Sequence, residues 1–307
     1  MVFRLGYRKF SLKIVQNVLY SSNISKMSTN IPQFEHLSVS VPKEFVYHVE
    51  LNRTDKLNAM NNAMFKEITR CFETLSDSED CRVVVLSGSG KIFCAGIDLK
   101  DFAQNSLPAV ALIEDPARKA KLLYQLCTLY QKSMSSLEHC KKPVIAAIHG
   151  ACIGGGVDLV TAADVRHCTK DAYFVVKEAD VGLAADIGSL QRLPKVIGSD
   201  SLARELCYTC RKFPADEALT SGLVSKVYND KDTMFESVIN IAEDIAKKSP
   251  VAIQTTKASL VFSRDHTVEE GLEHIALLNQ LMLQSEDLAT AATGQLMKDS
   301  NIQFSKL

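Results

Sequence analysis

The chain has 307 residues, which is enough for one large domain or two of ordinary size. Hydrophobic residues make up 46% and charged residues 23%, as in globular proteins, and the net charge of −1 gives no indication of binding to nucleic acid. No apolar run approaches the roughly 20 residues that span a bilayer. The nine cysteines are an odd number, and the histidines lack the spacing of metal ligands. We therefore expect no disulfide framework, no metal and no membrane span.

The two ends of the chain have the composition of targeting signals. Residues 1–34 contain no acidic residue, and their basic residues alternate with apolar residues and serines, as in a mitochondrial presequence. A basic tail without a targeting role is the alternative. The chain ends in Ser305-Lys306-Leu307, the tripeptide that a peroxisomal import receptor recognises at a free C-terminus. The sequence thus predicts a protein of the mitochondrion and the peroxisome whose residues 1–34 lie outside the fold.

Between these ends, the hydrophobic pattern alternates between strands and helices. Period-two alternation and short β-branched runs predict strands at 45–53, 82–88, 142–150, 165–168 and 173–176. Helical spacing predicts helices at 61–75, 121–140 and 157–163. This alternation is typical of an α/β fold with crossover connections.

From about residue 199 onward the pattern becomes helical. The last stretch, 268–298, has an apolar face formed by Leu272, Ile275, Leu278, Leu281 and Met282. An apolar face of this width is expected to be buried. It can pack either against the chain's own domain or against a neighbouring subunit.

Two glycine-containing segments follow predicted buried strands. The first, LSGSGKIFCAGIDLKDF (86–102), is not a phosphate-binding loop, because Val85 stands where that motif needs glycine. It is not a dinucleotide fingerprint either, because Phe93 replaces the third glycine. The second segment is Gly154-Gly155-Gly156. Free backbone amides from two such loops can bind one developing oxyanion, and losing one donor typically costs ~3 kcal/mol; ordinary turns are the alternative.

Three segments resemble the crotonase (enoyl-CoA hydratase/isomerase) superfamily: LNRTDKLNAM (51–60), KIFCAGIDLKDF (91–102) and the run from Lys142 to Gly198. The resemblance covers nearly the whole chain after the presequence. It implies a spiral of ββα units over residues 35–235, followed by a helical oligomerisation region over residues 236–307. It further implies trimers or pairs of trimers (a homohexamer), a fatty acyl-CoA substrate and no cofactor.

The resemblance also assigns the substrate-binding positions. The backbone amides of Ile97 and Gly155 match the two donors of the family's oxyanion hole. The loops around the thioester match Gly96, Ile97, Asp98, Leu99, Lys100 and Gly156. The CoA nucleotide is received near Arg53, Lys56 and Leu57.

Three acidic residues distinguish subtypes within the superfamily. Typical hydratases have glutamate at both catalytic positions, whereas this chain has Asp158 and Glu178, and a third acid, Asp186. This set resembles the members that isomerise 3,5-dienoyl-CoA to 2,4-dienoyl-CoA in fatty acid β-oxidation. It implies that Glu178 removes the proton from C2, Asp186 protonates C6 and Asp158 assists, with burial raising the pKa of the two carboxyls that exchange protons.

Alternatives remain open at this point. Asp186 could cap a helix that starts near Ser189, and Glu178 could form an exposed ion pair with Lys177. For the whole chain, the alternatives are an enoyl-CoA hydratase and a member of the fold that binds RNA or has no activity. The net charge and the lack of a basic patch interleaved with aromatic residues argue against RNA.

Overall fold

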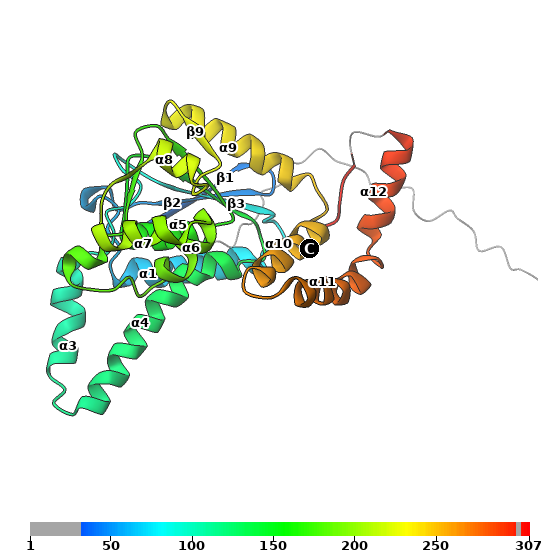
Figure 1. Ribbon diagram of the computed structural model, residues 1–307. Helices are drawn as coiled ribbons and strands as arrows, with labels where there is room; N and C mark the ends of the chain where they lie inside the picture. The colour runs from blue at the N-terminus through cyan, green and yellow to red at the C-terminus, as the bar shows by residue number, and fades with distance from the viewer. Residues whose placement is uncertain (1–31, 299–301) are drawn as a thin grey trace, which may run out of the picture. The chain divides into compact units, whose positions relative to one another are not determined.

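The computed structural model describes residues 32–298 and 302–307 (Figure 1). The predicted presequence, residues 1–34, therefore lies almost wholly outside the described residues. Among the helices of the described part, none has both the length and the hydropathy that crossing a bilayer requires. The same residues contain no cluster of side chains suited to holding a metal ion.

A six-stranded sheet forms the centre of the fold, in the order β1-β2-β3-β4-β6-β9. Its strands are β1 (Leu37–Lys43), β2 (Val46–Leu51), β3 (Val83–Gly88), β4 (Val144–Ile148), β6 (Val165–Thr169) and β9 (Lys226–Tyr228). Only the β1–β2 pair is antiparallel within this sheet. A smaller sheet contains β5 (Ala151–Ile153), β7 (Tyr173–Val175) and β8 (Phe213–Pro214). The predicted α/β class is confirmed, although β1, β5, β8 and β9 were not predicted.

Helices cover both faces of the large sheet. On β3, Val83 and Val85 pack in one cluster with α9 (Lys231–Ala246), while Val84 and Leu86 belong to the cluster that includes α1 (Asn62–Asp77). Figure 1 shows α9 and α1 on opposite sides of the sheet. Because both faces are covered, every residue of β3 is buried, which explains its continuous apolar run.

The remaining helices connect and flank the strands. Between β3 and β4 the chain forms α2 (Leu99–Asp101), a π-helical turn η2 (Phe102–Ser106), α3 (Leu107–Ala111) and α4 (Pro116–His139). Later elements are α6 (Ser189–Ile197), α7 (Asp200–Thr209) and α8 (Ala215–Thr220). α4 packs against α1, and α6 packs against α5 (Gly155–Thr161) and α7.

The chain advances in units of two strands and a helix. In one unit β4 enters the large sheet, β5 enters the small sheet and α5 follows; in the next unit β6, β7 and the 3-10 helix η3 (Glu178–Val181) repeat this order. A bridge between Cys94 and Cys152 extends the repetition to the unit that starts with β3. The expected spiral of ββα units is therefore present. Because the second strand of one unit pairs with that of the next, the segments that follow these strands lie side by side.

The C-terminal region contains α10 (Pro250–Ser263), α11 (Val268–Met282) and α12 (Glu286–Met297). The stretch 268–298, predicted as a single helical run, is divided because Ser285 caps α12 and accepts a hydrogen bond from the Asp287 amide (3.2 Å). The expected boundary at residue 235 falls inside α9, which packs on the sheet as far as Ala246. On α11, Leu272 and Leu281 are 64% and 66% exposed, whereas Ile275, Leu278 and Met282 are half-buried, so the described part of the chain covers this apolar face only in part.

Residues 302–307 lie against the body of the chain. The Lys142 side chain is buried, and its Nζ donates a hydrogen bond to the main-chain oxygen of Leu307 (3.2 Å). Arg82 is also buried and donates to the Ser305 carbonyl oxygen (3.3 Å). The tripeptide that was predicted as a peroxisomal signal is thus held by two buried cations in the folded chain.

Candidate active site

The first glycine-containing segment forms a short parallel bridge with the segment that follows β2. Met60 pairs with Ile97: the Met60 amide donates to the Gly96 carbonyl (2.8 Å), and the Asp98 amide donates to the Met60 carbonyl (2.9 Å). In a parallel bridge these bonds go to the residues on either side of the partner. The N–H of Ile97 therefore points away from Met60, and none of the main-chain hydrogen bonds of the described loops uses it.

The second segment brings another amide to the same place. Gly154 has a φ of +50°, and its amide donates to the Val175 carbonyl (2.8 Å), which turns the chain into α5. Gly155 is the first residue of α5, where an amide has no acceptor within the helix. A Cβ built on Gly155 would lie 3.9 Å from the Ile97 nitrogen and 2.6 Å from Met60 Cε. Gly155 thus lies beside the Ile97 amide, and a side chain at residue 155 would obstruct the space next to that amide. Donation by both amides to one substrate oxygen stays a prediction.

Asp158 lies in the first turn of α5 and is fully buried. Its Oδ1 accepts a hydrogen bond from the Ser189 amide (2.5 Å), while its Oδ2 has no partner among the described residues. Burial, and next the charge of Glu178, raise the pKa of Asp158 from 3.8 to about 7. A carboxyl in this environment holds a proton near neutral pH.

Glu178 begins η3 and points toward the glycine turn. Its Oε1 lies 3.2 Å from the position that a Cβ on Gly154 would occupy, and its Oε2 is buried without a partner among the described residues. Burial raises the pKa of Glu178. Lys177 pairs with Asp180 (2.5 Å), so the alternative of an exposed Glu178–Lys177 ion pair is wrong.

Asp186 lies in the loop between η3 and α6. It does not cap α6: the N-cap residue is Gly188, without a side-chain bond, and Asp158 instead accepts the hydrogen bond of the first helical amide. The next residue, Ile187, has its Cδ1 3.8 Å from the Cβ position of Gly155, so the loop that carries Asp186 lies beside the glycine turn. After burial and other causes, the charge of Asp186 also raises the pKa of Asp158 and Glu178. The Asp186 side chain is exposed, so the expectation of burial is wrong for this residue in the chain alone. The cause is that its loop lies at the surface beside α4.

Six of the predicted substrate-binding residues fall into two groups, exposed and buried. Four of them are exposed: Lys56, Leu57, Leu99 and Lys100. Gly96 and Gly156 are buried in the loop backbone, and a Cβ on Gly156 would lie 3.0 Å from the Cβ of Cys94. Gly156 therefore permits close packing beneath the turn, and contact with substrate remains a prediction for all six.

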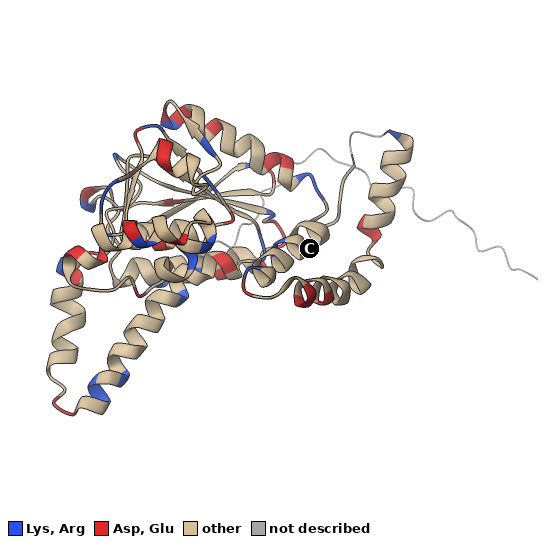
Figure 2. Cartoon of the chain, viewed as in Figure 1, with Lys and Arg blue, Asp and Glu red and all other residues tan. Residues whose placement is uncertain are grey.

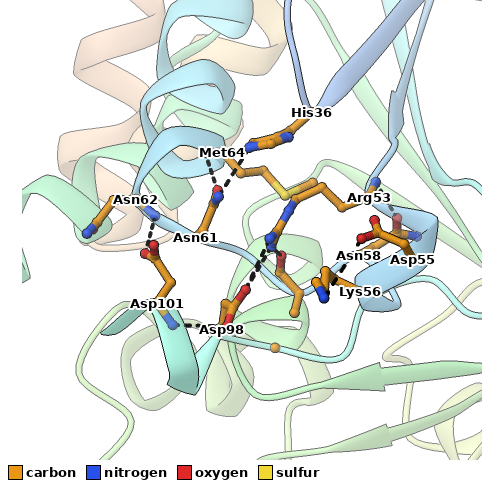
Figure 3. Close-up of polar contacts among 12 residues, drawn as sticks. His36, Arg53, Asp55, Lys56, Asn58, Asn61, Asn62, Met64, Asp98 and Asp101 are labelled. Carbon is orange, nitrogen blue, oxygen red and sulfur yellow. Dashed lines mark hydrogen bonds and ion pairs between the residues drawn. The ribbon is translucent and has the colours of Figure 1, made fainter. Parts of the chain in front are cut away.

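Arg53 and Asp98, also predicted to contact substrate, face each other. Figure 3 shows the Arg53 guanidinium directed at the Asp98 carboxylate, and both terminal nitrogens lie 3.1 Å from Asp98 Oδ2. Arg53 also donates to the Ala59 carbonyl oxygen. The guanidinium is therefore turned inward.

Three contacts of the site had no signal in the sequence. They are the Ser189 amide bound to Asp158, and the α4 side chains Gln131 and Cys127, which contact Asp186. Gln131 Nε2 donates to the Asp186 carbonyl (2.7 Å), and the Cys127 Sγ lies 3.6 Å from Asp186 Oδ2. The partners are far apart in sequence, so no local pattern relates them.

With this fold and site, the chain belongs to the enoyl-CoA hydratase/isomerase family, which it matches over residues 42–298. The resemblance inferred from the motifs is confirmed. A rat protein named Delta(3,5)-Delta(2,4)-dienoyl-CoA isomerase, mitochondrial, is 51% identical over 295 residues, covering 94% of this chain and 90% of that protein. An Arabidopsis thaliana protein named Delta(3,5)-Delta(2,4)-dienoyl-CoA isomerase, peroxisomal, is 44% identical and covers 85% of this chain and 93% of its own length.

The fold is also found in a protein named as a hydratase. The crystal structure of an enoyl-CoA hydratase from Bacillus anthracis superposes with a TM-score of 0.79 over 88% of this chain and 99% of that chain, at 28% sequence identity. The architecture is thus common to proteins named for hydration and for isomerisation. The side chains in the site have to distinguish them.

Proposed function

We propose that this protein isomerises 3,5-dienoyl-CoA to 2,4-dienoyl-CoA. The observation that carries the proposal is the position of two carboxyls with raised pKa, Asp158 and Glu178, at the glycine turn beside the Ile97 amide, with Asp186 in the adjacent loop. The printed names of the rat and Arabidopsis thaliana relatives support the same reaction.

The reaction needs two proton transfers at separate carbons. Glu178 removes a proton from C2 of the thioester, and the electron pair spreads over the thioester oxygen and along the chain to C6. The amides of Ile97 and Gly155 stabilise the negative oxygen. Asp186 then delivers a proton to C6, and the double bonds come to lie between C2 and C3 and between C4 and C5. Proton exchange with solvent restores the two carboxyls to their starting states.

Asp158 influences how readily Glu178 accepts a proton. Because its pKa is about 7 and Glu178 contributes to that shift, the two buried carboxyls together retain a proton more readily than isolated carboxyls do. We assign Asp158 the role of setting the basicity of Glu178. At the other end, an acyl chain lying over exposed Asp186 excludes water from the proton that moves to C6.

Hydration of a 2-enoyl-CoA is the second candidate, supported by the Bacillus anthracis hydratase fold. Purified protein is incubated with a 3,5-dienoyl-CoA, and the absorbance of the conjugated 2,4-dienoyl-CoA is followed; crotonyl-CoA hydration is measured in parallel. We expect isomerisation to dominate and Asp186→Asn to abolish it while crotonyl-CoA binding persists. Rapid hydration without isomerisation, or an active Asp186→Asn variant, contradicts the proposal.

We further propose that the protein works without a cofactor, as a homo-oligomer built from trimers, in mitochondria and peroxisomes. The exposed Leu272 and Leu281 on α11 support assembly, and the names of the relatives support both locations. Figure 2 shows acidic and basic residues interspersed on the helices, which argues against the basic surface that RNA binding requires. Light scattering tests the assembly, since a monomer at micromolar concentration contradicts it. Fusing the last residues to a reporter tests recognition of Ser305-Lys306-Leu307 by the peroxisomal import receptor.

A further inference from the structure

The Arg53–Asp98 ion pair joins the two loops that carry the Met60–Ile97 bridge. The side chains of Arg53 and Asp98 are 12% and 16% exposed, and both terminal guanidinium nitrogens contact the same carboxylate oxygen (3.1 Å each). The remaining contact of the guanidinium goes to the Ala59 carbonyl, next to Met60. One cation thus connects both sides of the bridge (Figure 3).

The Arg53 side of this connection is rigidly anchored. The Arg53 amide donates to Asn58 Oδ1 (2.9 Å), and the Asn58 amide donates to the Arg53 carbonyl (2.9 Å). Asn58 is fully buried, and its Nδ2 donates to the carbonyl oxygens of Ser89 (2.8 Å), Ile92 (3.1 Å) and Phe93 (3.1 Å). The Arg53 loop is therefore fixed to the end of β3.

The Asp98 side holds the oxyanion loop. Asp98 directly follows Ile97, its amide bonds to Met60, and its Oδ1 accepts a hydrogen bond from the Asp101 amide (3.1 Å). Although burial acts in the opposite direction, the hydrogen bonds from the Asp101 amide and Arg53 hold the pKa of Asp98 below its usual value. The carboxylate is thus charged and neutralised by Arg53. Without that cation, a negative charge would stand one residue from the amide that has to stabilise a negative oxygen.

We propose that Arg53 is a positioning residue for the oxyanion hole: through Asp98 it fixes the Ile97 amide and removes an opposing charge, rather than binding the CoA phosphates. This inference rests on the proposed function for the identity of the substrate. The expected loss of rate depends only on a thioester oxygen that becomes negative, which isomerisation and hydration have in common. A donor displaced by about 1 Å costs up to ~100-fold in rate. Loss of Arg53 therefore lowers kcat far more than it raises KM.

The test compares two thioesters of the same acyl group, one of CoA and one of pantetheine, which lacks the nucleotide. For Arg53→Met we expect kcat to fall about 10- to 100-fold with both thioesters, and KM to change less than about threefold. Lys56→Met is the matched control, since Lys56 is exposed and predicted to contact the nucleotide: its effect appears in KM and only with the CoA thioester. An effect of Arg53→Met confined to the CoA thioester overturns the inference.

Two further variants keep the outcome decisive. Arg53→Lys retains the charge but loses the fork of donors, so its kcat falls below that of the wild type with both thioesters, and this variant supplies the test if Arg53→Met fails to fold. Asp98→Asn lowers kcat with both thioesters as well. If the wild type hydrates crotonyl-CoA but does not isomerise dienoyl-CoA, the proposed function fails, and hydration then serves as the readout for Arg53. If kcat is unchanged in both Arg53→Lys and Asp98→Asn, this inference is overturned while the proposed function is unaffected.

Discussion

Replacing Asp158 by asparagine is expected to stabilise the folded chain at alkaline pH. Asp158 is fully buried, and its Oδ2 has no partner among the described residues. Asparagine has nearly the same shape, and its carbonyl oxygen can still accept the hydrogen bond from the Ser189 amide. The substitution therefore removes chiefly the cost of ionising a buried carboxyl.

The magnitude follows from the pKa difference between the folded and unfolded chain. The pKa of Asp158 rises from 3.8 to about 7, so the folded state binds more protons between these values. The free energy of unfolding of the wild type consequently falls as pH rises through this window. A difference of roughly 3 units at ~1.36 kcal/mol per unit amounts to about 4 kcal/mol near pH 8, and to less than about 1 kcal/mol near pH 4.

Urea denaturation at a series of pH values and one protein concentration measures this difference. We expect the free energy of unfolding of Asp158→Asn, minus that of the wild type, to rise by about 4 kcal/mol from about pH 4 to about pH 8. Asp186→Asn is the matched control, because its exposed side chain has no burial cost to relieve. A difference for Asp158→Asn that stays constant to within about 1 kcal/mol across this range refutes the reasoning.

Three other predictions concern single contacts. Gly188→Ala places a Cβ against Arg192 Nη1 at a φ of +149°, so thermal unfolding should show a loss of about 2 kcal/mol; an unchanged Tm contradicts this. Ile97→Ala should keep kcat within about threefold, because the donor is the main-chain amide, and a loss beyond ~100-fold would implicate the side chain. Deleting Leu307 leaves the buried Lys142 without the main-chain oxygen that it contacts and should cost about 1–3 kcal/mol in urea denaturation. Lys142→Met in the shortened chain should recover that loss, and no recovery would assign the loss to other contacts.

Prediction from the sequence succeeded where the signal was local. The β-branched run of β3 and the helical spacing of α1 follow from which residues must be buried, and both elements lie where the pattern placed them. The short strands β5, β8 and β9 were missed because two or three residues carry no measurable periodicity. The division of 268–298 into two helices depends on a cap at Ser285, which a periodic apolar pattern conceals.

The sequence by itself determined the α/β class, the family, and which acids and glycine turns to consider. The tertiary structure decided their surroundings. Ser189 lies 31 residues from the Asp158 that it contacts, and Arg53 lies 45 residues from Asp98. The burial of Asp158 and the orientation of the Ile97 amide are produced by residues that are distant in the sequence. They exist only once the ββα units have brought successive loops together, which is why an arginine near the predicted nucleotide site faces the oxyanion loop.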